Sequence, residues 1–270
     1  MMGKLRTSDT IGDHFPNVPA DKRDITIHQL LTHTSGLPES LGGDYEPLSR
    51  QAMIDRALAT KLMSKPGARY HYSNAGYSLL GAIIEEASGS GYEEFLNDQL
   101  FTPAGMAATG YVLPDWAPGQ VAIEYDARGR PHGRPFEHPW ADDGPYWNLR
   151  ANGGLLSTPR DMYRWDLALD GDEILDRHAK DELFRPYVRE ERGTKAFSGY
   201  GWAIQETPFG TAAGHDGGNP WSYGEILRLL DKDTMVFWVT NRSRNDDAGW
   251  NMTRLAPAVT GGVVERLLKR

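Results

Sequence analysis

Residues 66–88, PGARYHYSNAGYSLLGAIIEEAS, mark the point at which a polar loop becomes a helix. Pro66 and Gly67 end the preceding helical pattern, and Ser73 or Asn74 can cap the helix that follows. Tyr72 and Asn74 have one small residue between them, so an extended loop would turn both side chains the same way. We expect a phenol and a carboxamide to face one cleft, although a simple capping loop would also explain both residues.

The chain before this loop has the periodicity of helices. Residues 25–37, ITIHQLLTHTSGL, predict a short helix that Thr26 caps and Gly36 ends, and residues 47–63 predict a second one. After the loop, the segment YDARGRPHG predicts a hairpin and EHPWADDGPYW a long irregular loop. Ser157 or Thr158 is expected to cap a further helix.

The last third of the chain has the composition of strands. Four segments between residues 199 and 242 alternate or run apolar and β-branched, and the short turns between them favour an antiparallel sheet. A final amphipathic helix over about 250–268 is expected to cover one face of this sheet with Leu255, Val259, Val263, Val264 and Leu267.

These patterns predict an α+β fold in one domain, residues 1–270. About 20–150 is expected to be mainly helix and loop, and about 151–270 to form the sheet with its flanking helices.

Composition excludes several classes of partner and site. A formal net charge of −8 and a pI near 5.5 argue against nucleic acid and against an anionic membrane surface. The absence of cysteine excludes disulfides, thiolate nucleophiles and Cys-based zinc sites. His28 and His33 are five residues apart and no HExxH occurs, so we expect no metal and no cofactor.

The first sixteen residues hold no apolar run of signal-peptide length, and no window approaches a membrane span of about 18 apolar residues. The chain as given is therefore expected to be soluble and unexported, cytoplasmic by default, although its location stays unknown.

A second polar cluster is His215-Asp216-Gly217-Gly218, near the end of an expected strand. His215 could donate hydrogen bonds or supply positive charge, and the paired glycines would let a substrate carbonyl approach the backbone closely. Taken alone, His215 is more often a structural histidine and Asp216 a turn residue.

The order of five motifs, ITIHQLLTHTSGLP, PGARYHYSNAGYSLLG, GGLLSTPRDM, GYGW and GHDGG, resembles the penicillin-recognising serine hydrolases, which include class C β-lactamases, D-stereospecific peptidases and related esterases. The resemblance covers nearly the whole chain. It implies a β-lactamase/transpeptidase-like fold, an antiparallel sheet flanked by helices beside a mostly helical region, with the active site between them. It also implies an acyl-enzyme mechanism on a small ester, amide or peptide substrate.

The same resemblance implies roles for four residues. Tyr72 would help to move the proton of a nucleophilic serine, and Asn74 would bind the amide or ester side of the substrate. His215 and Gly217 match the His-x-Gly form of the third motif, which suits esterases and peptidases better than avid β-lactamases. A tyrosine acts as a base only where a neighbouring cation lowers its pKa from about 10.

The family's nucleophile is the serine of Ser-x-x-Lys, and no Ser or Thr among residues 1–270 has a lysine three positions later. We therefore expect the N-terminal strands and the nucleophile helix to be absent from this chain, and acyl transfer to be weak or absent. An incomplete start, a nucleophile-less relative that only binds peptides or other ligands, and a helix supplied by another chain are the alternatives. The apolar surface left by a missing helix would favour a homo-oligomer.

Other polar residues have ordinary interpretations. Ser35, before Gly36, is typical of a C-terminal turn and is not expected to replace the nucleophile. Asp142 and Asp143 suggest a solvated loop. The tryptophans at four positions are expected in the core or in a cleft wall: Trp140, Trp147, Trp202 and Trp221. Substrate choice would depend on loops at about 111–150 and 215–224.

Overall fold

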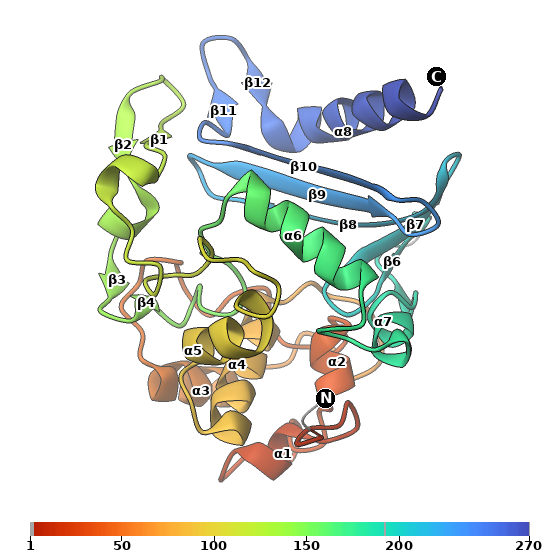
Figure 1. The fold of residues 1–270 in the computed structure, drawn as a ribbon. Helices are drawn as coiled ribbons and strands as arrows, with labels where there is room; N and C mark the ends of the chain where they lie inside the picture. The colour runs from red at the N-terminus through yellow and green to blue at the C-terminus, as the bar shows by residue number, and fades with distance from the viewer. Residues whose placement is uncertain (1–2, 192, 270) are drawn as a thin grey trace. The chain divides into compact units, whose positions relative to one another are not determined.

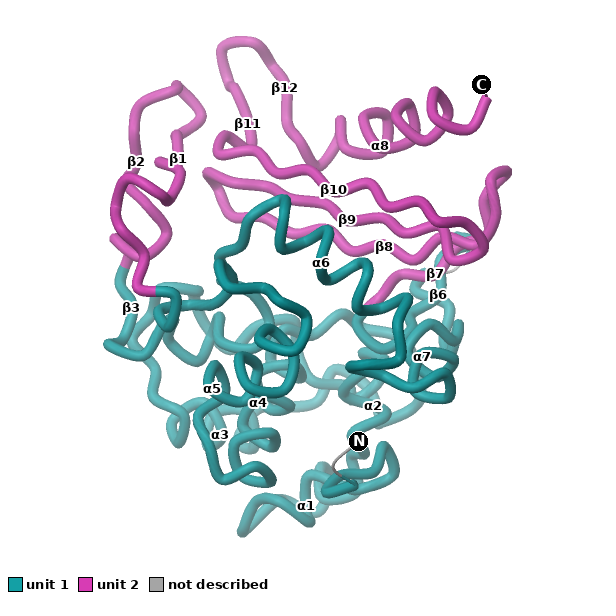
Figure 2. Tube along the Cα trace, viewed as in Figure 1, with its two compact units in different colours: residues 1–114, 139–201 teal, residues 115–138, 202–270 magenta. Residues whose placement is uncertain are grey.

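The computed structural model describes residues 3–191 and 193–269. The chain divides into two compact units, residues 1–114 with 139–201 and residues 115–138 with 202–270 (Figure 2). Each unit is assembled from segments that are far apart in the sequence, so neither unit corresponds to one continuous stretch of chain. Met1 and Met2, at the start of the segment searched for an export signal, lie outside the described residues.

Unit 1 is built around α4, which packs against α1, α2, α3 and α5 (Figure 1). Its core includes Leu30, Met53, Leu79 and Ile83, all nearly inaccessible to solvent. The helices of this unit are α1 (Ile11–His14), α2 (Ile27–Leu31), α3 (Arg50–Ala59), α4 (Asn74–Ser88), α5 (Tyr92–Leu96), α6 (Pro159–Asp170) and α7 (Arg177–Leu183), and α5 continues into a π-helical turn, η1 (Asn97–Phe101).

The helix predicted over residues 25–37 is shorter in the structure. Thr26 caps α2 as expected, since its side chain accepts a hydrogen bond from the Gln29 N–H. The helix ends at Leu31, so Gly36 as its terminator was wrong. The backbone beyond Leu31 bonds to a later segment instead, with Met63 N donating to Gly36 O and Gly67 N to Thr34 O. The helix predicted over residues 47–63 is also shorter, and it is α3, capped by Ser49.

The main sheet is antiparallel, as predicted, with six strands in the order β10-β9-β8-β7-β6-β5. Its strands in unit 2 are β7 (Ala203–Thr207), β8 (Gly210–Gly218), β9 (Tyr223–Leu229) and β10 (Thr234–Thr240), and those in unit 1 are β5 (Val188–Arg189) and β6 (Ala196–Ser198).

Short elements occupy the segment that the sequence predicted as hairpin and loop. The predicted hairpin is present as β1 (Glu124–Tyr125) and β2 (Pro131–Gly133). The remaining short elements are η2 (Pro118–Gln120), η3 (Pro135–Glu137), β3 (Trp140–Ala141) and β4 (Gly144–Pro145), with a further pair, β11 (Arg244–Asn245) and β12 (Trp250–Asn251), before the last helix.

The last helix, α8 (Met252–Leu268), packs against β9 and β10. Val264 is buried as predicted, but the structure exposes four other residues of the predicted stripe, by 40 to 54 %: Leu255, Val259, Val263 and Leu267. The sheet side is instead formed by Ala256, Thr260 and Val264. The smaller side chains Ala256 and Thr260 allow a close approach, and Thr260 Oγ1 accepts a hydrogen bond from Trp238 Nε1 at 2.9 Å.

The start of α6 is fixed by local and distant hydrogen bonds. Thr158 is the cap, because its side chain accepts from the Asp161 N–H at 3.1 Å. The buried carboxylate of Asp161 in turn accepts from Ala108 N and from the hydroxyl of Thr109. The helix therefore holds the loop at residues 108–109. Within the described ranges, no helix combines the length and apolarity needed to cross a membrane.

The cap of α6 can be tested with a matched pair of substitutions. Thr158→Ala removes the acceptor for the Asp161 N–H and is expected to cost about 1 kcal/mol of stability, whereas Thr158→Ser keeps it. Urea unfolding followed by circular dichroism should give a lower midpoint for Thr158→Ala alone. Equal midpoints for the two variants would contradict this assignment.

Candidate active site

The loop that carries Tyr72 is held by the segment of residues 33–39 in unit 1. His71 N donates to His33 O at 2.8 Å, Ser73 N donates to His33 Nδ1 at 3.0 Å, and Asn74 N donates to Glu39 O at 2.8 Å. Three backbone donors of the loop thus find partners in one neighbouring segment. The backbone of residues 71–74 is therefore fixed by bonds that do not involve the side chains of Tyr72 or Asn74.

Ser73 carries the structural contacts of this loop. Its side chain is 1 % exposed, donates to Pro38 O at 2.7 Å and accepts from Gly76 N at 3.0 Å, so Ser73 is the cap of α4. Tyr72 and Asn74, on either side, are half-buried. Within the described residues, the carboxamide of Asn74 has no hydrogen-bond partner, and the capping interpretation of Asn74 is wrong.

An aromatic cluster that includes Tyr72 surrounds His33. The ring of His33 lies 4.4 Å from that of Tyr72, 5.0 Å from that of Tyr77 and 5.7 Å, edge on, from that of Tyr70. Burial raises the pKa of Tyr70 and of Tyr77 far above the usual value, so both phenols stay protonated at neutral pH. The hydroxyl of Tyr77 donates to Leu31 O at 2.8 Å. Tyr77 therefore serves as a packing and donor group, and Tyr70 packs against the ring of His33.

His215 and Gly217 lie on β8 in unit 2, whereas Tyr72 and Asn74 belong to unit 1. The His215 side chain reaches solvent, yet the protein atoms crowded around it partly desolvate the ring and lower its pKa, and Asp216 opposes this effect. The ring is therefore neutral at pH 7, when it can both donate and accept a hydrogen bond.

Asp216 is part of β8, paired with Glu225, so its interpretation as a turn residue was wrong. Its carboxylate accepts a hydrogen bond from the hydroxyl of Tyr223 at 2.8 Å. Burial and this bond together raise the pKa of Tyr223. Asp216 therefore ties the end of β8 to β9.

The two glycines after Asp216 differ in what surrounds them. A Cβ on Gly218 would lie 2.6 Å from the carbonyl oxygen of Ser222, so the turn into β9 accepts only glycine there. A Cβ on Gly217 would meet no atom within 4 Å. Packing does not require the bare backbone at Gly217, which leaves open space beside it.

A buried carboxylate that the sequence gave no reason to single out fixes the next turn. Glu124, 2 % exposed, accepts from Ser222 Oγ at 2.6 Å, from Asn219 Nδ2 at 3.0 Å and from His138 Nε2 at 2.7 Å. Asn219 Oδ1 accepts in turn from the backbone N–H groups of Trp221 and Ser222. The buried carboxylate of Glu124 therefore fixes the side chains of the turn that follows Gly218.

Trp221, at this turn, forms a stack with two imidazoles. The ring of His132 lies 3.8 Å from the indole and that of His138 lies 4.6 Å from it, both nearly parallel to it. His132 is exposed and Trp221 half-buried, which fits the expected role of this tryptophan in the wall of a site. Trp147, in contrast, is buried in the core of unit 1.

Two further polar residues have clear structural roles. Asp142 and Asp143 are exposed, as expected, and the Asp143 carboxylate in addition bonds twice, at 2.7 Å each, to the buried guanidinium of Arg150, which lowers the pKa of Asp143. Ser35 is 1 % exposed and its Oγ accepts from Leu37 N at 3.3 Å. Its burial leaves no access for a substrate.

The described part of the chain holds no group of three or more His, Asp or Glu side chains arranged to bind a metal ion. His28 Nδ1 lies 2.8 Å from the hydroxyl of Tyr200, and His33 bonds to Ser73. Both histidines therefore have protein partners.

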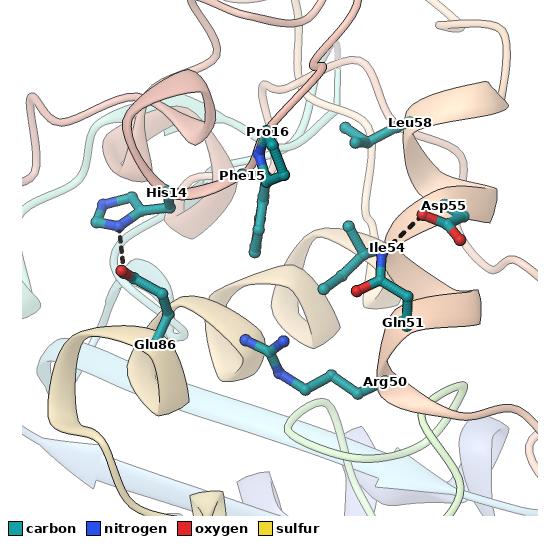
Figure 3. A pocket seen from close by; sticks show the side chains of 9 residues that line it. All are labelled: His14, Phe15, Pro16, Arg50, Gln51, Ile54, Asp55, Leu58 and Glu86. Carbon is teal, nitrogen blue, oxygen red and sulfur yellow. Dashed lines mark hydrogen bonds and ion pairs between the residues drawn. The ribbon is translucent and has the colours of Figure 1, made fainter.

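A hollow of about 130 Å³ lies elsewhere in unit 1 (Figure 3). Its lining includes the hydrogen-bonded pair His14 and Glu86, with Arg50, Gln51 and Asp55 opposite. It is smaller than the roughly 300 Å³ typical of a ligand site. None of the four residues selected from the sequence lines it.

Comparison with known proteins identifies the family. Residues 2–258 match the family model described as Beta-lactamase. The chain belongs to the β-lactamase family. Penicillin-binding protein 4* of Bacillus subtilis is 28 % identical over 260 residues, which cover 91 % of this chain and 57 % of that protein. The chain spans about half the length, or less, of the curated relatives that it matches first.

Solved structures of the β-lactamase family share the fold. A penicillin-binding protein from Bacillus halodurans has a TM-score of 0.74 at 26 % identity, covering 88 % of this chain and 74 % of that one. An octameric penicillin-binding protein homologue from Pyrococcus abyssi has a TM-score of 0.75 at 26 % identity, covering 96 % of this chain and 61 % of that one.

The D-amino acid amidase of Ochrobactrum anthropi SV3 matches with a TM-score of 0.69 at 24 % identity, covering 90 % of this chain and 72 % of that one, which shows likeness of fold alone. Together, the matches confirm the family and the α+β fold class expected from the five motifs. The roles of Tyr72, Asn74, His215 and Gly217 stay predictions.

The importance of Glu124 can be measured by unfolding. Glu124→Ala leaves the partners Ser222, Asn219 and His138 without their buried acceptor and is expected to cost about 3 kcal/mol. Glu124→Gln keeps one oxygen acceptor on a side chain of the same size, and it should lower the free energy of unfolding by about 1 kcal/mol. Thermal melts of the three proteins should follow this order, and a Glu124→Ala protein as stable as the parent would refute it.

Proposed function

We propose that this chain forms the substrate-binding part of a serine hydrolase that cleaves an ester or amide through an acyl-enzyme. Tyr72 takes part in proton transfer, Asn74 binds the substrate's amide or ester group, and His215 with Gly217 contacts the acyl carbonyl. The observation that carries the proposal is that neighbouring residues of the loop 72–74 have different contacts. Ser73 makes the contacts that the fold needs, and the Asn74 carboxamide has no described protein partner.

The geometry of β8 supports the same chemistry. A Cβ on Gly217 would meet no atom within 4 Å, so the fold does not require glycine there, and its absence leaves room for a substrate carbonyl to approach the strand. His215 with a lowered pKa is a neutral donor at pH 7, suited to hydrogen bonding and not to permanent charge. The similarity to penicillin-binding proteins, at 26–28 % identity, supports binding of a penicillin-like ligand.

We propose further that residues 1–270 alone form no acyl-enzyme, because no Ser-x-x-Lys pair occurs among them. The alternative function is reversible binding of peptide-like ligands without turnover. The carboxamide of Asn74, which has no partner among the described residues, and the space beside Gly217 would serve both functions equally.

Intact mass spectrometry tests the covalent step. The 270-residue chain is incubated with benzylpenicillin and, separately, with an activated ester, and we expect no acyl adduct and no turnover. A stoichiometric adduct mapped to one serine of this chain would overturn the proposal on the nucleophile. The Tyr72→Phe variant should behave like the parent, since no proton of a serine nucleophile is there to be moved.

Reversible binding tests the recognition step on the same samples. Ligand-observed NMR with benzylpenicillin should detect binding, and Asn74→Ala should weaken it about tenfold, the cost of roughly one hydrogen bond. Gln99→Ala, which removes an exposed carboxamide on the π-helical turn, is the control and should leave binding unchanged. Equal binding by the parent and Asn74→Ala would remove Asn74 from the site.

We also propose that the chain self-associates through α8. The exposed line of Leu255, Val259, Val263 and Leu267 supports this proposal, and the homologue from Pyrococcus abyssi is octameric. Sedimentation velocity should show an oligomer that Leu255→Ser with Leu267→Ser dissociates. Leu113→Ser, which changes an exposed leucine of unit 1, is the control. A parent chain that stays monomeric at high concentration would contradict the proposal.

A further inference from the structure

His33 occupies a backbone conformation that few residues adopt. Its φ of 57° lies in the left-handed region, and the residue is only 5 % exposed. A non-glycine residue there is strained, so surrounding contacts must hold it. This turn, directly after Thr32 at the end of α2, directs both the carbonyl and the ring of His33 to the loop of Tyr72.

The two hydrogen bonds of His33 to that loop lie on either side of Tyr72. The backbone oxygen accepts from His71 N at 2.8 Å, and ring atom Nδ1 accepts from Ser73 N at 3.0 Å. Tyr72 therefore lies between two backbone groups that a single residue holds. Because Nδ1 accepts from an N–H, it carries no proton, and the neutral ring has its proton on Nε2.

The ring of His33 also contacts the side chain of Tyr72. The two rings lie 4.4 Å apart with an angle of 35° between their planes. The imidazole is itself packed against Tyr77, whose hydroxyl is bonded to Leu31 O. Tyr72 thus rests on a ring whose position is fixed by α2 and α4.

We propose that His33 is a positioning residue that fixes the backbone on both sides of Tyr72 and holds Asn74 at the first position of α4. This inference rests on the proposed function, in which Tyr72 and Asn74 face the substrate. His33 acts through the hydrogen bond that its Nδ1 accepts from the Ser73 N–H, and has no role in the reacting atoms. A buried histidine that only fills space would need neither the unprotonated Nδ1 nor the bond to Ser73.

Two substitutions separate the acceptor from the ring. In His33→Asn, the Oδ1 atom can reach the position of Nδ1, and asparagine tolerates positive φ, so the acceptor is kept and the ring is lost. In His33→Phe, the ring is kept and the acceptor is lost. Should His33→Phe fail to fold, His33→Gln moves the acceptor toward the Nε2 position, and its comparison with His33→Asn tests the acceptor while the ring is absent from both.

Amide hydrogen exchange on the full 270-residue chain reads the bond directly, with the Ser73 amide compared with that of Ile83 in the middle of α4. We expect His33→Phe to speed exchange at Ser73 about tenfold relative to Ile83, while His33→Asn stays close to the parent. The imidazole ¹⁵N spectrum of the parent should show His33 protonated on Nε2 alone. Leu30→Ala, a core substitution within α2, controls for a general loss of stability and should not change the ratio.

Binding of benzylpenicillin by the same variants connects position to function. We expect His33→Asn to keep most of the affinity of the parent, and His33→Phe to lose about as much as Asn74→Ala. Unchanged Ser73 exchange in His33→Phe, or equal exchange in both variants, would overturn the proposal. Where the parent chain itself binds no ligand, the proposed function fails, while the exchange ratios still decide whether His33 holds the loop.

Discussion

The bonding of one loop to one neighbouring segment is the constraint on which unit 1 depends. Residues 33–39 accept hydrogen bonds from His71, Ser73 and Asn74, and Thr34 and Gly36 accept from Gly67 and Met63. The helix α2 ends at Leu31, and the residues that follow it make these bonds instead of continuing the helix. The start of α4, around which the core of the unit forms, is positioned by the same contacts. A polar segment therefore determines where the hydrophobic core can lie.

In unit 2, the carboxylate of Glu124 fixes a turn in a similar way. The turn between β8 and β9 follows Gly217, which has free space beside it, and carries Trp221. Glu124 accepts hydrogen bonds from the side chains of Asn219 and Ser222 in this turn. In both units, buried residues fix the backbone of a loop. Ser73 and His33 do so in unit 1, and Glu124 does so in unit 2. The residues proposed for recognition, Asn74 and Gly217, contribute only backbone contacts, the bond from Asn74 N to Glu39 O and the pairing of Gly217 with Gly224. A rigid binding site requires such support from neighbouring residues.

Several local signals in the sequence predicted correctly, although the end of α2 at Leu31 and the strand position of Asp216 did not follow from them. The cap Thr26 and the four strands of unit 2 were predicted, and for α4 and α6 the cap is one of the two residues proposed, Ser73 and Thr158. The buried face of α8 was predicted wrongly, because apolar periodicity marks a stripe but not which half of it meets the sheet. There, the small residues Ala256 and Thr260 were decisive. Glu124 carried no signal, since its partners Asn219 and Ser222 are 95 and 98 residues away.

That separation has a consequence for the growing polypeptide. On the ribosome, Glu124 and the β1–β2 hairpin emerge long before Asn219 and Ser222 exist, so a carboxylate destined for burial stays hydrated until about a hundred further residues are made. The β1–β2 hairpin stays without these partners while residues 139–201 of unit 1 are synthesised. Such distant partners slow the search for the native arrangement and lengthen exposure to chaperones and to proteases.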